Sequence, residues 1–446
     1  MWDTWGYYFG NTFYLYYLTG PYRKQIWDGV GLAISHDGVH WNDQGKVIDK
    51  AEDSVWLGSG AVWPVINRAA REQKFIMNFS EFRGSRQQGR QTIFFAESKD
   101  LIHWTRLGAC YEFRQDTRWY ERNGRWDNIW PVVRPGGGYY GYWAATPKNK
   151  VVGLGFGESD DGITWKALEP PVLSDVPLGP PSLQSPEVGA VHIWKGKYYA
   201  LPGLNDLESV VNNDFTDFQP GHTTMVADSP SGPFVPVPKN RRLLVGNASY
   251  FARVIDTKGG VLVNHHSWAI RKGEMLNVEE GTSCMTPLKR AVWDEEGTLR
   301  LKWWENNEKA KDKVVAIESQ LSETPFDPDR VLILEGVMRF SFGLTGLHLQ
   351  GMGNRGTGFL VHKNGFVEYG DIDSDGTGFE KKGHVDRDIP LQGTARFRLI
   401  RTGRITEFYL NDYLMQCYCL PEYGTGRIGI IGHRDALSNL RAWYCS

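Results

Sequence analysis

The segment Ser35-His36-Asp37-Gly38-Val39-His40-Trp41 is the first copy of a phrase that returns along the chain, and this repetition indicates the fold. A second and a third copy occupy residues 98–104 and 159–165, and a variant copy occupies residues 229–234. Successive copies lie roughly sixty residues apart, and a fixed period of this kind indicates a repeat architecture. Asp-Gly between two strand-like segments is a hairpin signal, so each copy predicts a turn between two strands.

Each copy of the phrase follows a short apolar segment and, further upstream, an aromatic one. In the first repeat these segments are residues 30–34 and 13–17, and the later repeats keep the same order. A fifth unit extends from Tyr250 to Trp304. Repeats that each hold roughly four strands are typical of propeller blades. We therefore predict an all-β chain with a five-bladed β-propeller over residues 1–308, and an array of β-sandwiches is the alternative.

The remainder of the chain differs from the repeats. Residues 309–332 are charged and then Pro-bearing, which predicts a linker. Beyond them, alternating strand-like segments are separated by turn sequences at residues 363–365, 401–403 and 411–412. This pattern predicts a C-terminal β-sandwich over residues 333–446.

The composition is that of a globular protein with many aromatic rings. Of 446 residues, 41% are hydrophobic and 23% charged, and 18 Trp, 20 Tyr and 21 Phe are present. Aromatic rings fill cores and also pack against the C–H faces of sugars. The net charge is −2, with 50 basic and 52 acidic residues, and it argues against a nucleic-acid partner, which would need a basic domain.

No segment approaches the ~18 consecutive apolar residues of a membrane span, so we expect no membrane partner. No secretory signal is visible, which favours a cytoplasmic protein, although a mature secreted chain would look the same. The five cysteines are Cys110, Cys284, Cys417, Cys419 and Cys445. Their spacing matches neither a disulfide framework nor a zinc motif. We predict no cofactor and no catalytic metal, and the sequence leaves homo-oligomerisation open.

Three acidic residues, Asp3, Asp127 and Glu187, stand at matching places in three of the repeats, before the first strand of each. The first strand of every propeller blade lines the central channel, so equivalent positions converge there. Cleaving a glycosidic bond requires a proton donor and a carboxylate near the anomeric carbon. We therefore predict that the three acids are catalytic. Taken singly, a solvated terminus, a turn cap and a surface charge would explain them equally well.

Short motifs around these acids resemble those of known sugar-cleaving enzymes. Trp2-Asp3-Thr4-Trp5 resembles the Trp-Asp-Ser-Trp phrase of levansucrases, and residues 56–62 are similar to the Trp-Ser-Gly-Ser-Ala segment of invertases and levansucrases. Residues 407–412 resemble a Glu-x-Phe-x-Asn strand of the invertase sandwich, and residues 227–234 are similar to a phrase of arabinanases and β-xylosidases. Over nearly its full length, the chain resembles the five-bladed propeller superfamily of glycoside hydrolases, which includes families 32, 43 and 68.

This resemblance implies a role for each acid. Asp3 would be the nucleophile, or the base in an inverting enzyme, Asp127 the transition-state stabiliser, and Glu187 the general acid/base. The chain departs from invertases in having no Pro after Asp3, in placing Trp126 before Asp127 where Arg is expected, and in having Val188 in place of Cys. These departures bear on the substrate more than on the fold.

The neighbours of the acids supply the predicted substrate-binding residues, which are Trp2, Trp27, Ser59, Trp63, Arg83, Arg125, Trp130 and His266. For each ring, packing in the core is the alternative, and for Arg83 it is a solvated hairpin position. Glu81 is a rival to Asp127 for the role of second carboxylate.

Together the residues and the resemblance predict a retaining glycosidase that acts on a non-reducing-end furanoside. The substrate they favour is a β-fructofuranoside. Its partner would be an oligosaccharide or small glycoside. An inverting arabinofuranosidase or xylosidase and a non-catalytic carbohydrate-binding propeller are the alternatives. The sequence does not separate hydrolysis from transfer to another sugar.

Overall fold

The computed structural model describes the chain apart from residues 21–26, 66–72, 85–88, 149–152, 175–185, 206–219, 245–248, 269–282, 341–342, 374–375, 390, 392 and 446. It forms two compact units. The first unit comprises Met1–Val237, Tyr250–His266 and Asn277–Thr286. The second comprises Pro238–Ser249, Ser267–Leu276 and Pro287–Ser446.

The first unit is built from consecutive antiparallel sheets that follow the sequence repeats. The first sheet holds β1 (Trp2–Phe9), β2 (Thr12–Thr19), β3 (Gly29–Ser35) and β4 (Asn42–Asp49). The second holds β5 (Ser54–Pro64), β6 (Phe75–Arg83), β7 (Arg90–Ser98) and β8 (Thr105–Arg106), and the short 3-10 helix η2 (Ala109–Tyr111) follows it. The third holds β9 (Trp126–Val133), β10 (Tyr139–Ala145), β11 (Gly155–Ser159) and β12 (Lys166–Ala167).

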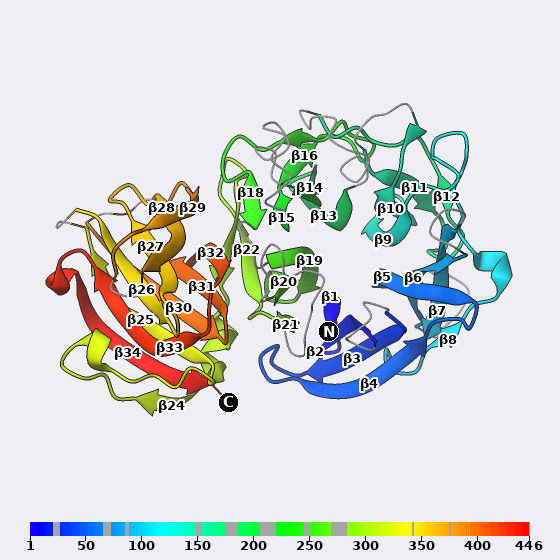
Figure 1. Cartoon of the computed structure of the whole chain (residues 1–446). Coiled ribbons are helices and arrows are strands. Elements are labelled where there is room, and N and C mark those ends of the chain that lie inside the picture. The colour runs from blue at the N-terminus through cyan, green and yellow to red at the C-terminus, as the bar shows by residue number, and fades with distance from the viewer. Residues whose placement is uncertain are drawn as a thin grey trace. The chain divides into compact units, whose positions relative to one another are not determined.

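The fourth sheet of this unit contains β13 (Glu187–Trp194), β14 (Lys197–Asn205), β15 (Pro220–Thr223), β16 (Met225–Ala227) and β17 (Val235–Pro236). The fifth begins with β19 (Ser249–Thr257), β20 (Gly260–Trp268) and β21 (Ser283–Met285). In Figure 1 the strands β1, β5, β9, β13 and β19 lie at the inner edge of the ring of sheets. The fold is the predicted five-bladed β-propeller.

The repeated turn phrase joins the third and fourth strands of a blade. In the first copy, the Asp37 carboxylate accepts hydrogen bonds from the backbone N–H groups of Val39 and His40, both at 2.9 Å. The Ser35 hydroxyl accepts one from Gly38 at 2.8 Å. Gly38 has a φ of 73°, a left-handed conformation that glycine adopts without strain. The Ser-x-Asp-Gly pattern is thus a self-capped turn, which explains its recurrence.

Hydrophobic clusters fill the spaces between consecutive blades. Trp5, Leu32 and Phe79 belong to the cluster between the first two blades. Trp63 and Trp126 belong to the next cluster, between the second and third blades. Because each inner strand is packed from both sides in this way, the residues at its start are held in fixed positions.

The second unit is a β-sandwich with its core between two sheets. One sheet contains, in order, β22 (Lys289–Trp293), β23 (Leu299–Trp303), β32 (Tyr413–Cys419), β31 (Ile405–Leu410), β30 (Thr394–Thr402), β25 (Leu332–Arg339), β34 (Leu437–Cys445) and β24 (Lys311–Val315). The other contains β29 (Glu380–Val385), β28 (Val367–Asp373), β27 (Arg355–Val361), β26 (Thr345–Gly351) and β33 (Gly424–Ile431). The unit also holds β18 (Arg242–Leu244) and the 3-10 helices η5 (Glu305–Ala310), η6 (Leu321–Glu323) and η7 (Arg434–Ala436).

The units differ in two respects from the domain bounds predicted from the sequence. Residues 309–332, predicted to be a linker, contain β24, which pairs with β34 of the sandwich. Strands β22 and β23, predicted within the propeller, fall in the second unit. The domain bounds 1–308 and 333–446 stay a prediction.

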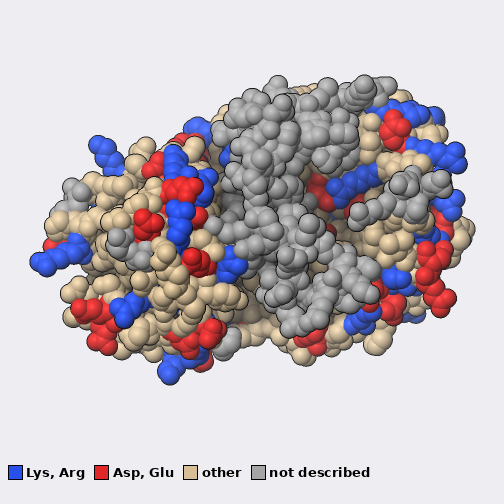
Figure 2. All heavy atoms as spheres, viewed as in Figure 1, with Lys and Arg blue, Asp and Glu red and all other residues tan. Residues whose placement is uncertain are grey.

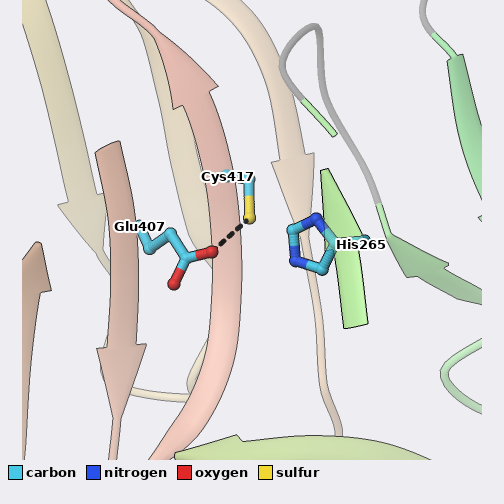
Figure 3. A group of neighbouring side chains, drawn as sticks. All are labelled: His265, Glu407 and Cys417. Carbon is cyan, nitrogen blue, oxygen red and sulfur yellow. Dashed lines mark hydrogen bonds between the residues drawn. The ribbon is translucent and has the colours of Figure 1, made fainter. Parts of the chain in front are cut away.

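Glu407 lies in β31 and is an internal structural group of the second unit. The Lys289 ammonium donates to its Oε1 at 2.6 Å, and the Tyr409 hydroxyl donates to its Oε2 at 2.6 Å. The Cys417 thiol also donates to Oε1, at 3.5 Å (Figure 3). A buried carboxylate is tolerated only when it is paired and hydrogen-bonded, as here.

The visible surface carries charges of both signs. On the face seen in Figure 2, Lys and Arg side chains are interspersed with Asp and Glu, as expected for a net charge of −2. Among the residues that the structure describes, no helix is long and apolar enough to cross a membrane.

Candidate active site

The inner strands are irregular at the places where the predicted catalytic residues stand. A β-bulge interrupts the pairing of β1 with β2 between Trp2 and Trp5, and another interrupts β9 against β10 just after Asp127. A third lies in β13 between Val188 and Val191. Bulges bend a strand and redirect its side chains, and they are frequent beside active sites. The bulges thus turn the beginnings of three inner strands out of the regular pleat.

Asp3 has a perturbed carboxyl group. Its φ is 41°, an uncommon left-handed value for a residue other than glycine. The residue is half-buried, but its Oδ1 atom is inaccessible and has no hydrogen-bond partner among the described residues. Burial, followed by repulsion from Asp127, raises the pKa of Asp3 to about 7, although Arg253 and Arg125 act in the opposite direction. Asp3 is therefore ionised only in part near neutral pH.

Asp127 is buried and held by a chain of polar contacts from the second blade. The Ser80 hydroxyl donates a hydrogen bond of 2.6 Å to its Oδ1. The Gln91 amide in turn donates to the Ser80 oxygen at 2.9 Å. Gly58 leaves room for this contact, since a Cβ atom there would lie 2.4 Å from the Ser80 oxygen and 2.8 Å from Asp127 Oδ1. The position of Asp127 is thus fixed by two blades.

Glu187 is the first residue of β13, and Arg125 links it to Asp127. The Arg125 guanidinium forms a salt bridge with Glu187 Oε1 and lies 3.6 Å from Asp127 Oδ2. The Asn128 amide donates to Glu187 Oε2 at 3.4 Å. Because Asp3 is coupled electrostatically to Asp127, the structure brings all three predicted acids into one neighbourhood. They come from the first, third and fourth blades.

Aromatic rings lie beside Asp3. Trp2 stacks against Trp27, with ring centroids 5.8 Å apart and an interplanar angle of 13°. The His266 ring lies on Trp2 at 4.7 Å. Burial lowers the pKa of His266 to about 3, so this imidazole is neutral at physiological pH. Trp2, Trp27 and His266 thus form one aromatic group next to a candidate catalytic carboxyl.

Two other predicted site residues, Trp63 and Trp130, are held by contacts within the propeller. Trp63 is buried, with only 2% of it exposed, and its indole N–H donates to the Gly162 carbonyl; its contact with a substrate stays a prediction. Trp130 donates to the Val191 carbonyl at 2.8 Å, and its ring lies under the Arg253 guanidinium at 5.0 Å. These two tryptophans pack within the propeller.

The remaining predicted residues lie on or near β5 and β6. Ser59 is buried and accepts a hydrogen bond from Asn128 at 3.5 Å, which keeps it near the acids. Arg83 pairs with Glu81 and Asp53 at 3.3 and 3.4 Å. Glu81 is fully buried and also bonds to Arg106 and to the Ala51 N–H. Its oxygens are satisfied by structural partners, so Glu81 does not compete with Asp127 as a site carboxylate.

Sequence reasoning missed Ser80, Asn128 and Arg253. Asn128 is fully buried, with a φ of 46° at the bulge, and it contacts both Ser59 and Glu187. Its position directly after Asp127 is the sequence signal for this conformation, because Asn tolerates a left-handed φ better than most residues. Ser80 and Arg253 reach the acids from other strands, and no local motif marks them. Within either unit, no group of three His, Cys, Asp or Glu ligand atoms among the described residues is close enough to hold a metal ion.

Solved structures of sugar-cleaving enzymes share this fold. Sucrose-6-phosphate hydrolase from Lactobacillus gasseri aligns over 100% of this chain and 90% of its own, with a TM-score of 0.75 and 14% identity. A family 32 β-fructofuranosidase from Bombyx mori aligns over 100% and 91%, with a TM-score of 0.70 and 15% identity. Exo-inulinase from Aspergillus awamori aligns over 100% and 95%, with a TM-score of 0.70 and 14% identity. No protein-family model and no curated protein matches the sequence. At such identities the likeness establishes the fold.

Proposed function

We propose that the propeller is a glycoside hydrolase that cleaves a non-reducing-end furanoside, first of all a β-fructofuranoside. The observation that carries this proposal is the convergence of Asp3, Asp127 and Glu187 at the starts of inner strands, where Arg125 links Asp127 to Glu187. The fold shared with sucrose-6-phosphate hydrolase, a β-fructofuranosidase and an exo-inulinase supports the same class of substrate. An oligosaccharide or small glycoside would be the substrate, and a cytoplasmic location stays a prediction.

In the proposed mechanism Asp3 attacks the anomeric carbon, and Glu187 protonates the leaving oxygen. Water then cleaves the glycosyl-enzyme, with Glu187 acting as base. Asp3 suits the attacking role because it is poorly solvated, and a positive charge that develops on the sugar would favour its ionised form. Asp127, held by Ser80, would accept hydrogen bonds from sugar hydroxyls.

Arg125 has two effects in this scheme. As the cation next to Glu187, it favours the ionised carboxylate, which is the form needed when Glu187 activates water. For the first step Glu187 must carry a proton, so its contact with Arg125 has to loosen when the leaving group enters. The aromatic group of Trp2, Trp27 and His266 would pack against a sugar face beside Asp3.

A substrate panel tests the proposal. Sugar release is measured with the wild-type protein on sucrose, short fructo-oligosaccharides, inulin, levan and aryl arabinofuranosides. We expect fructose from the fructosides. Release of a pentose alone would support the alternative that the enzyme is an arabinofuranosidase. Binding of these sugars without release of any would favour the non-catalytic alternative and contradict the proposal.

The stereochemistry of the first product separates the two mechanisms. NMR of the freshly released sugar, recorded before mutarotation, would show a retained anomeric configuration for the proposed mechanism. An inverted product would mean that Asp3 acts as a base on water rather than as a nucleophile.

A further inference from the structure

The side-chain amide of Gln91 has a fixed orientation. The backbone N–H of Trp126 donates a hydrogen bond of 3.2 Å to Gln91 Oε1. Because a backbone N–H can only donate, the amide oxygen must face Trp126, and the amide nitrogen must face the other way. That nitrogen donates to the Ser80 hydroxyl at 2.9 Å. Gln91 is buried, so these two contacts determine which end of the amide meets Ser80.

The strand register places Ser80 beside this amide. Ser80 of β6 is paired with Ile93 of β7, and Gln91 stands two residues before Ile93, on the same face of the sheet. The Gln115 amide donates to the Gln91 backbone carbonyl at 2.9 Å. Gln91 is thus anchored both by its own strand and by the segment that precedes β9.

Ser80 has one hydrogen to donate, and its surroundings offer one acceptor. Ser80 is fully buried, and among the described residues its hydroxyl contacts only Gln91, which donates to it, and Asp127 Oδ1 at 2.6 Å. The hydroxyl hydrogen therefore points to Asp127. A proton on Asp127 Oδ1 would instead point at the serine oxygen and would leave the serine hydrogen buried without an acceptor, which is costly.

The two acids differ in what surrounds their oxygens. The second oxygen of Asp127, Oδ2, lies 3.6 Å from the Arg125 guanidinium, which disfavours a proton there. Asp3 Oδ1, in contrast, is buried without a hydrogen-bond partner among the described residues. A proton on Asp3 removes the repulsion between the two carboxylates and breaks none of these bonds.

Other charged groups act on the pair as well. Arg253 favours the ionised form of Asp3, but burial and Asp127 outweigh it, because the pKa of Asp3 is about 7. The further titratable groups around the pair are Glu187 of β13, His266 of β20 and the Met1 amino group.

We propose that the hydrogen-bond chain from Gln91 through Ser80 decides where this pair of acids keeps its proton, because it holds Asp127 as the carboxylate and leaves the proton on Asp3. Ser80 and Gln91 are positioning residues, since they act through Asp127. The catalytic consequence rests on the proposed function: Asp3, and not Asp127, is the acid that must lose a proton before the reaction. The location of the proton itself does not depend on that function.

Carbon-13 NMR of the protein labelled at the carboxyl carbons of aspartate tests the location of the proton. The resonances of Asp3 and Asp127 are assigned by their absence from the spectra of Asp3→Asn and Asp127→Asn. The wild-type protein is then titrated from about pH 5 to about pH 9. The Asp3 resonance should titrate near pH 7, while the Asp127 resonance keeps the position of a carboxylate. A wild-type Asp127 resonance that titrates in this range would overturn the proposal.

Variants of the chain test whether it decides the location. In Ser80→Ala part of the proton should move to Asp127, so that the Asp127 resonance titrates as well. Gln91→Leu should have the same effect to a smaller extent, because the Ser80 hydroxyl is then free to turn away, and this variant leaves Ser80 intact. The matched control is Thr92→Val, which removes a hydroxyl from the next residue of β7, on the opposite face of the sheet. An Asp127 resonance that stays a carboxylate in both Ser80→Ala and Gln91→Leu would overturn the proposal.

The pH dependence of kcat/KM tests the catalytic consequence, with the sugar that the substrate panel identifies. The midpoint of the rise in kcat/KM should be the same in the wild type and Thr92→Val. In Ser80→Ala it should move to higher pH by up to about one unit, because the protonated pair gains a second arrangement. A merely structural role would lower kcat at every pH without moving the midpoint, and that result would overturn the catalytic part. If the wild type releases no sugar, the proposed function fails, and the NMR titration still decides where the proton lies.

Discussion

Replacing Asp3 with Asn should stabilise the folded protein at alkaline pH. The folded-state pKa of Asp3 is about 7 against an ordinary value of 3.8. Below pH 3.8 the carboxyl group is neutral in both the folded and the unfolded state. As the pH rises towards 7, the unfolded state ionises first, and the folded state loses stability. A difference of about three pKa units corresponds to about 4 kcal/mol of folding stability, and this stability is fully lost above pH 7.

The assay is urea unfolding of wild type and Asp3→Asn, followed by tryptophan fluorescence, at pH 4 and at pH 8. We expect the variant to exceed the wild type by up to about 4 kcal/mol in free energy of unfolding at pH 8, and by less than about 1 kcal/mol at pH 4. The control is Asp160→Asn, because the Asp160 side chain is 88% exposed, and its effect should stay within about 0.5 kcal/mol at pH 8.

Two results would contradict this prediction. If Asp3→Asn were no more stable than the wild type at pH 8, burial and the neighbouring Asp127 would not destabilise the ionised form of Asp3. If its gain were the same at pH 4 and at pH 8, the stabilisation would come from packing rather than from charge.

Three further predictions concern the candidate site and the core of the second unit. If Asp3 must be ionised to attack, kcat/KM rises with pH through about 7; a fall there would make Asp3 the proton donor instead. Gly58→Ala should lower kcat, because its Cβ would displace the contact of Asp127 with Ser80, whereas Gly108→Ala, in open space, should not. Lys289→Met should destabilise the second unit by about 3–5 kcal/mol in urea unfolding, since it removes the cation that pairs with the buried Glu407 carboxylate, and added Glu407→Leu should recover most of the loss; a harmless single variant would contradict this.

The propeller was predictable from the sequence because its defining feature is local. The turn phrase works through side-chain to backbone bonds across two or three residues, such as Asp37 to Val39 and His40. Its repetition then places equivalent positions together, which is why the neighbourhood of Asp3, Asp127 and Glu187 could be anticipated.

The finer geometry of the site depends on contacts that no local pattern encodes. The bond from Ser80 to Asp127 joins residues 47 positions apart, and Arg253 approaches Asp3 from another blade. The burial of Trp63 between two blades is likewise a property of tertiary packing, and the sequence shows only an aromatic residue near a promising motif. The bulges that redirect the inner strands are of the same kind.

In the proposed mechanism, Asp3 and Glu187 perform the chemistry. The most direct measurement is the rate of fructose release from a short fructo-oligosaccharide by the wild type, Asp3→Asn, Glu187→Gln and the control Glu158→Gln, whose side chain is 33% exposed and pairs with Arg134. We expect both site variants to lose activity, Glu187→Gln by about 10²–10⁴-fold, while the control keeps the wild-type rate. Fructose release by either site variant at the wild-type rate would contradict it.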